Sequence, residues 1–138
     1  MADWIPRQGE QAALERIVGE SLYLGLHGMT AAQLTTLGDD VMWTDIVAAA
    51  GHPEVQLVPG SWAVPSGSDR GDPATYPVVR FTGQAGRGDV GGFYIRTPGN
   101  LLLAVGLHPD VMAGQPLKTM GEGEFYDVDL SLPAEPAT

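Results

Sequence analysis

Glycine and proline divide residues 76–109 into three short apolar segments, and this division constrains the fold more than any other feature of the chain. The segments are residues 78–81, 93–95 and 101–105, which are rich in the β-branched, aromatic and aliphatic side chains typical of strands. The connections between them are too short to hold a crossover helix, so we expect neighbouring strands to run antiparallel. In the second connection, Pro98 and Gly99 suit the central positions of a type II turn.

The composition fits one folded domain. A length of 138 residues is usual for a single domain, and a hydrophobic content of 43% is too high for a disordered chain. The 19 glycines and 11 prolines favour many short strands over long helices. Cysteine is absent, which excludes disulfides and thiolate metal sites. We therefore predict a mainly β fold, an antiparallel β-sandwich or barrel-like domain with one N-terminal amphipathic helix.

That helix is predicted over residues 9–18, where apolar side chains recur at helical spacing and Gly19 is placed to end it. Leu22, Leu24 and Leu26 then alternate with other residues, which predicts a strand with one buried face. Residues 30–37 predict a short helix with Thr30 as N-cap and a glycine at its end.

The next segments are harder to assign. Residues 39–50 are ambiguous, and residues 46–50 could form a second short helix closed by Gly51. Residues 54–58 and 61–64 resemble a hairpin turned at Pro59 and Gly60, with Trp62 anchoring the core.

Two loops and a final strand complete the domain. Residues 66–75 contain no large apolar side chain and are the most loop-like segment, and residues 110–123 form a second loop with several glycines. Residues 124–132 predict the last strand, with one face formed by the side chains of Tyr126, Val128, Leu130 and Leu132.

Three regions are expected along the chain: an N-terminal arm at residues 1–8, a single β-rich domain at residues 9–132 and a flexible tail at residues 133–138. The tail is too rich in proline and alanine to fold by itself. In the arm, Trp4 and Ile5 precede a proline. This pair either packs onto its own domain or binds a neighbouring subunit. We predict the partner-binding role for Trp4 and Ile5, because large apolar anchors dominate many interfaces.

The charge argues against several partners. The net charge of -10 comes from 17 acidic and 7 basic residues, and the sequence has no cluster of Lys or Arg, so we expect no direct contact with nucleic acid. An acidic chain is highly soluble or docks on a basic surface. No apolar run approaches a membrane span, and residues 1–10 lack the pattern of a signal peptide. We expect synthesis in the cytoplasm of the producing cell, with export only as part of a larger assembly.

Residues 86–91 match the glycine spacing of a dinucleotide-binding fingerprint. That motif requires a helix directly after it, whereas the following residues predict a strand, so we interpret the match as chance. Arg-Gly-Asp occurs at residues 70–72 and 87–89, in loops 66–75 and 84–90. Such tripeptides can serve as adhesion ligands, but turns flanked by solvated charges are the more common case.

No catalytic or metal-binding pattern is recognisable. The histidines lack the spacing of metal ligands; they are His27, His52 and His108. The carboxylates near the last strand do not form an EF-hand; they are Glu122, Glu124, Asp127 and Asp129. No partner base lies near the serines Ser61, Ser66 and Ser68. We therefore expect a core or turn role for one or more histidines and a solvated strand face for the carboxylates. The chain is predicted not to be an enzyme and to need no cofactor or metal.

The order of segments resembles that of small structural proteins of tailed bacteriophages. A short arm and a helix (residues 9–18) lead to a leucine-x-leucine strand (22–26) and then to a strand ending near a tryptophan (55–62). A proline-bearing strand (76–81), a glycine-rich hairpin (91–95) and two apolar strands (101–104 and 123–132) follow. Residues 27–50 depart from the pattern, because they look helical where such proteins often have a variable loop.

The resemblance implies an accessory structural protein of the virion, which decorates and stabilises the head or forms a minor part of the tail. Its partners would be copies of itself and other virion proteins, the major capsid or tail subunits. The alternative is a receptor- or carbohydrate-binding module at the tail tip that uses loops 66–75 and 84–90. Aromatic side chains at loop tips would favour this alternative, and these two loops have none.

Overall fold

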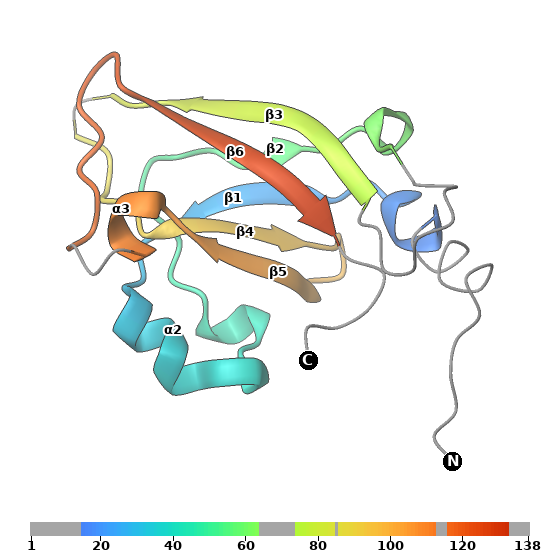
Figure 1. Cartoon of the computed structure of the whole chain (residues 1–138), viewed down its shortest axis with the longest axis horizontal. Coiled ribbons are helices and arrows are strands. Elements are labelled where there is room, and N and C mark those ends of the chain that lie inside the picture. Colours follow the sequence, from blue (N-terminus) through green and yellow to red (C-terminus); the bar gives the residue numbers. More distant parts are fainter. Residues whose placement is uncertain (1–14, 64–73, 85, 113–115, 133–138) are drawn as a thin grey trace.

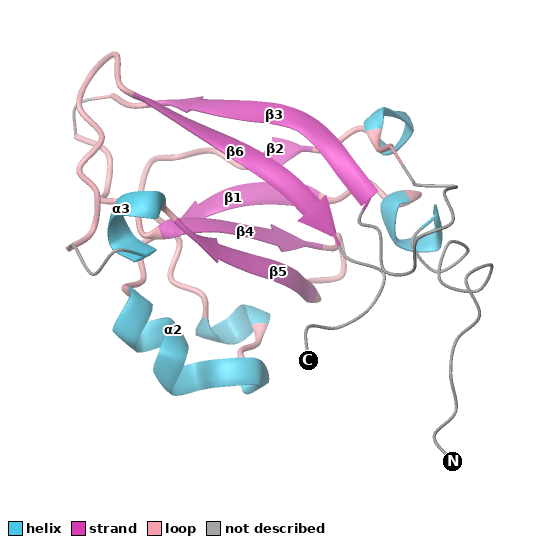
Figure 2. Cartoon of the chain, in the orientation of Figure 1, coloured by secondary structure: helices cyan, strands magenta, loops and turns pink. Residues whose placement is uncertain are grey.

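The computed structural model describes residues 15–63, 74–84, 86–112 and 116–132, with the side chains of Asp39 and Leu132 also left out of the description. The described chain is mainly β (Figure 2). Its strands are β1 (Tyr23–His27), β2 (Val55–Gln56), β3 (Ala74–Thr82), β4 (Gly92–Arg96), β5 (Leu102–Leu107) and β6 (Phe125–Leu132). Its helices are α2 (Ala31–Leu37) and α3 (Pro109–Met112), with short 3-10 turns at Gly38–Asp40, Trp43–Asp45 and Pro59–Ser61.

The strands form two antiparallel sheets (Figure 1). One sheet has four strands in the order β2-β1-β4-β5, and the other pairs β3 with β6. The first two of the three strands expected within residues 76–109 are therefore not neighbours, although the short connection between them favoured an antiparallel pair. The glycine-rich connection after β3 carries the chain into the other sheet, where β4 pairs with β1 on one side and β5 on the other.

The apolar core draws on both sheets. Leu22, Leu24 and Leu26 are almost fully buried, as the alternation along this strand predicts. On β6, Tyr126, Val128 and Leu130 are buried while the intervening residues are exposed, which confirms the predicted faces for those positions. The same cluster contains Ile95 of β4 and the predicted anchor Trp62.

The second face of β1 is also covered, contrary to the prediction of a single buried face. His27 is fully buried and Tyr23 is partly buried. Across Gly25 lies the ring of Tyr94, which a Cβ at residue 25 would overlap. Glycine is therefore required where this aromatic ring crosses the strand.

The predicted helix over residues 30–37 is confirmed as α2. Thr30 Oγ1 accepts a hydrogen bond from the Gln33 backbone N–H at 3.2 Å, and Gln33 Oε1 accepts one from the Thr30 N–H at 2.9 Å. This reciprocal capping box fixes the start of the helix. Gly38 follows with φ of 60°, a conformation that glycine adopts without strain.

A second helix over residues 46–50 is not observed. Ala48 instead forms an antiparallel bridge with His27, and the Gly28 N–H donates to the Val47 carbonyl at 2.8 Å. Pairing with the end of β1 therefore overrides the local helical tendency of this alanine-rich segment.

The hairpin predicted over residues 54–64 is also wrong. Val55 and Gln56 pair with β1, and Ala63 bridges to Thr75 at the start of β3. Residues 55–56 and Ala63 therefore pair with different strands. The start of β3 also places Ala74 and Thr75, expected at the end of a loop, within a strand.

The turn between β4 and β5 differs from the predicted type II turn, which needs positive φ at Gly99. The positive φ falls on Asn100, at 64°, and the Asn100 N–H donates to the Thr97 carbonyl at 3.0 Å. The register of the two strands shifts between Ile95 and Arg96. A residue in the left-handed region next to a bulge is a common ending of a three-residue hairpin loop.

Several predictions concern residues outside the described ranges: the arm with Trp4 and Ile5, most of the first helix and the tail at residues 133–138. Residues 15–18 at the end of that helix are helical, and the Gly19 N–H donates to the Glu15 carbonyl at 2.9 Å. None of the helices in the described ranges has the length and apolar character needed to cross a bilayer.

Candidate functional site

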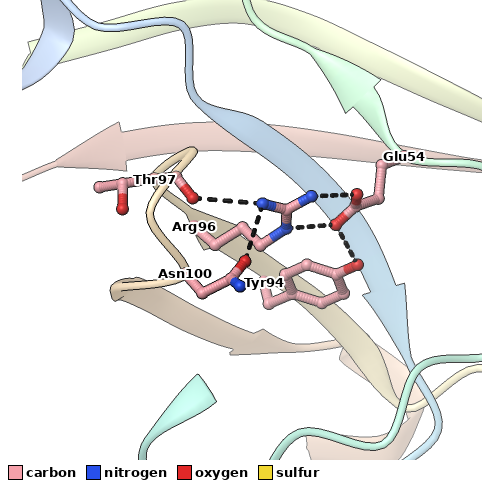
Figure 3. A network of polar contacts seen from close by, with 5 residues as sticks. All are labelled: Glu54, Tyr94, Arg96, Thr97 and Asn100. Carbon is pink, nitrogen blue, oxygen red and sulfur yellow. Dashed lines mark hydrogen bonds and ion pairs between the residues drawn. The ribbon is translucent and has the colours of Figure 1, made fainter. Parts of the chain in front are cut away.

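A half-buried cluster of charge and aromatic rings lies at the ends of β1, β2 and β4 (Figure 3). Arg96 at the end of β4 binds Glu54 with two hydrogen bonds, Nε to Oε2 at 2.8 Å and Nη2 to Oε1 at 2.6 Å. The Tyr94 hydroxyl donates to the same Glu54 Oε2 at 2.6 Å. We call Glu54, Tyr94 and Arg96, with the residues they contact, the Arg96 cluster.

Arg96 also holds the adjoining turn. Its Nη1 donates to the Thr97 carbonyl at 3.2 Å and to Asn100 Oδ1 at 3.1 Å. The guanidinium lies 4.5 Å from the centroid of the Tyr23 ring and 5.2 Å from that of Trp43. One cation therefore links β1, the turn after β4, the residue before β2 and the 3-10 turn at Trp43–Asp45.

The electrostatics of the cluster favour a fixed charge pair. Hydrogen bonds from Arg96 are the main cause that lowers the pKa of Glu54, so this carboxylate stays ionised. Burial, with the Glu54 hydrogen bond, raises the pKa of Tyr94, which keeps the hydroxyl protonated and donating. Since these groups satisfy one another, we interpret the cluster as a structural clamp rather than a reaction centre.

Sequence reasoning did not find this cluster. Glu54 and Arg96 are separated by 42 residues, and neither lies in a recognisable motif. Their proximity depends on β1 pairing with both β2 and β4, which no local pattern reveals.

The sequence analysis expected a core or turn role for one or more of the histidines, and His27 lies in the core. Its Nε2 donates to the Gly106 carbonyl at 2.8 Å, and its Nδ1 accepts from the Met29 N–H at 3.1 Å. A donor and an acceptor on the two nitrogens define the neutral ring. Burial lowers the pKa of His27, so the neutral form persists in the folded chain.

The stability of the fold should therefore fall as the pH drops below about 6.5, the pKa of an unperturbed histidine. In the unfolded chain His27 takes up a proton at that pH, whereas in the folded chain it does so only at lower pH. The unfolded state then binds more protons and is favoured, by roughly 1 kcal/mol for each pH unit. Thermal melts at about pH 7.5 and about pH 5.5 should show this loss in the wild-type chain.

The matched comparison is the His27→Gln variant, which lacks the titrating group. Its melting temperatures at the two pH values should differ less than those of the wild type. An equal difference in both chains would contradict the assignment. The lowered pKa of Glu54 produces its own loss of stability, but only at more acidic pH, where carboxylates titrate.

The remaining motifs do not converge on a site. Residues 86–91 lead directly into β4 and not into a helix, so the structural context of a dinucleotide fingerprint is missing. In the Arg-Gly-Asp at residues 87–89, the Gly88 N–H donates to the Ala50 carbonyl at 2.7 Å and Asp89 accepts from Thr119 at 2.9 Å. This tripeptide therefore lies against the chain, and the one at residues 70–72 is outside the described ranges.

The described carboxylates and histidines do not gather around a common point. Asp127 is exposed and pairs with Arg80, and Glu124 lies 3.4 Å from Lys118, as expected for a solvated face. His52 Nε2 donates to the Gly88 carbonyl at 3.0 Å. Within residues 15–63, 74–84, 86–112 and 116–132, no group of three or more such side chains is placed to hold a metal ion.

A recess borders β5, the last strand in the order of its sheet. It has a volume of about 590 Å³ and is lined by α2 and its C-terminal end, Val41, Met112 and all six residues of β5. A smaller hollow shares Val41 and Leu102 with it and continues toward Asn100 and Leu101. We call this continuous recess the β5 groove; none of its lining residues is charged.

Large apolar side chains are exposed around the β5 groove. Met112 is 66% exposed, Leu101 64% and Met42 63%. Contiguous exposed apolar surface with few charges marks contact sites for other molecules. The β5 groove is therefore the candidate functional site, and the sequence analysis located its strand without recognising that one edge would be open.

Comparisons with known proteins found no relative: no protein-family model, no curated protein and no solved structure matches this chain.

Proposed function

We propose that this chain is an accessory structural protein of a tailed-phage virion. In this proposal it decorates and stabilises the head or the tail through symmetric contacts with copies of itself and with other virion proteins. Its two antiparallel sheets, which share one core, would form a β-sandwich that presents binding surfaces instead of a reaction centre.

The observation that carries the proposal is the β5 groove. An open edge strand with an uncharged recess beside it is suited to adding a strand or an apolar surface from another subunit. The half-buried charges of the Arg96 cluster, by contrast, are paired with one another, which supports a non-catalytic role. The segment order described for the sequence supports the virion as the place of assembly.

The proposal is tested on purified particles from the producing strain. Mass spectrometry should find the chain at a fixed copy number per particle, because symmetric decoration fills every equivalent position. Particles made without it should lose their contents at lower temperature than wild-type particles, and adding back the purified protein should restore the difference. Recovery of the chain only from the cell lysate, with none in the particles, would contradict the proposal.

A further inference from the structure

Natural sheets protect their free edges, and the described strands of this chain do so at every edge except one. β2 is only two residues long, β3 contains Pro77 and an irregular register, and β6 carries Asp127 and Asp129. Shortness, proline, irregularity and charge are the usual devices against strand addition. β5 is six residues long, has neither charge nor proline, and shifts register only near its first residue. β5 is therefore an edge suited to pairing.

We propose that β5 pairs antiparallel with β5 of a second copy across a two-fold axis. The two four-stranded sheets would then become one continuous sheet of both subunits. Such an axis is perpendicular to the sheet, so both copies of α2 lie on the same face of it. Apolar side chains of each β5 would then fill the β5 groove of the other copy. This inference rests on the proposed function and specifies which surface makes the contact between copies of the chain.

The distribution of charge along the chain favours a second copy as the partner of β5. Two chains with a net charge of -10 repel each other wherever carboxylates meet. Residues 21–38 and 97–109, which contain α2 and β5, include no Asp, Glu, Lys or Arg. Like chains can approach here without that repulsion. A cationic or anionic peptide, in contrast, would find no charge along the strand to recognise.

The antiparallel direction follows from the charge at the end of the strand. Asp110 lies just beyond β5 and is exposed. In an antiparallel pair the two copies of Asp110 lie at opposite ends, roughly 30 Å apart at the usual rise of a strand. That separation exceeds the screening length of about 8 Å at physiological salt. A parallel pair would instead bring both carboxylates to the same end.

Apolar area completes the interface. A six-residue strand spans only about 20 Å, which is short for a stable contact by itself. The exposed side chains of Leu101 and Met112 flank β5, and the β5 groove of about 590 Å³ offers further apolar surface to the partner. Strand pairing would fix the register while these side chains supply the burial.

The first test measures the mass of the purified chain by light scattering after size-exclusion chromatography. The wild type should elute as a dimer of the 14.5 kDa chain. Met112→Glu places a carboxylate in the β5 groove of both copies and should give a monomer. The control Val78→Glu makes the same change at another exposed apolar residue, 54% exposed on β3, and should remain a dimer. Both variants should melt cooperatively, because neither residue is buried.

The second test does not depend on those substitutions. The chain has no cysteine, so one introduced thiol reports a single contact. Val105→Cys, in the middle of β5, should form a covalent dimer under oxidation or with a short bis-maleimide, because strands paired across the axis lie about 5 Å apart. Gln56→Cys, on the opposite edge of the same sheet, should form no covalent dimer under the same conditions.

The results of these two tests distinguish failure of the β5 pairing from failure of the proposed function. A wild-type chain that stays monomeric at about 100 μM, or equal cross-linking at both cysteines, would overturn the β5 pairing even if the chain occurs in particles. A dimer that Met112→Glu disrupts and Val105→Cys traps would support the pairing even if the particles lack the chain. Equal masses for Met112→Glu and Val78→Glu would also contradict it.

Discussion

Replacing Gly91 with alanine should lower the free energy of unfolding by about 3 kcal/mol, at the upper end of the cost of inserting atoms into a packed site. A Cβ at this position would overlap the carbonyl oxygen of Met29, which is a backbone atom and cannot turn aside as a side chain could. Gly91 also donates its N–H to the His27 carbonyl at 2.7 Å and accepts from the His108 N–H at 2.8 Å. Relief of the overlap would therefore disturb hydrogen bonds at the ends of β1 and β5.

The experiment is urea denaturation followed by tryptophan fluorescence. The matched control is Gly99→Ala, because a Cβ there meets nothing nearer than Thr97 Oγ1 at 3.9 Å and the residue does not adopt positive φ. This control should unfold at the wild-type urea concentration or slightly above it. Indistinguishable midpoints for the Gly91 variant and the wild type would show that the two segments do not approach as described.

Replacing Arg96 with alanine should cost about 2 kcal/mol of unfolding free energy. Loss of one partner from a buried ion pair costs about 3–5 kcal/mol, and partial exposure of this pair reduces the figure. The side chains of Arg96 and Glu54 are 16% and 27% exposed. The variant leaves Glu54 without its two hydrogen bonds from the guanidinium and removes the cation from the rings of Tyr23 and Trp43.

The chain provides a control with the same geometry and a different environment. Arg80 also binds a carboxylate with two hydrogen bonds, to Asp127 at 2.7 and 2.9 Å, but both side chains are exposed. Arg80→Ala should therefore unfold close to the wild type, because solvent screens exposed pairs. Arg96→Lys should recover only part of the loss, since an ammonium group lacks the planar fork. Equal destabilisation by Arg96→Ala and Arg80→Ala would contradict the clamp.

Local patterns predicted the elements that local interactions determine. The Thr30 capping box begins α2 because both of its partners lie within one turn. The buried leucines of β1 and the alternating faces of β6 follow from the two-residue period of a strand. The exposed position of Asp127 follows from the same period. The burial of His27 does not, because it lies on the second face of β1, which the alternation predicted to be open.

Pairing between distant segments could not be predicted in this way. The local sequence of residues 46–50 favours a helix, but Ala48 instead bridges to the end of β1. The connection after β3 is short enough for a hairpin, yet β3 pairs with β6. The Arg96 cluster and the β5 groove both depend on the strand order β2-β1-β4-β5, which sequence spacing does not encode. The arm with Trp4 and Ile5 stays a prediction.

The position of β1 between β2 and β4 has a consequence for how the chain is made. β1 is synthesised before its partner β4, which follows roughly 3–15 s later at the usual rate of synthesis. During that interval only the two-residue β2 becomes available to pair with β1. Because closing long loops precedes any gain from distant contacts, such folds complete slowly, in milliseconds to seconds. The nascent chain, more than the finished protein, is therefore the form most in need of protection by chaperones.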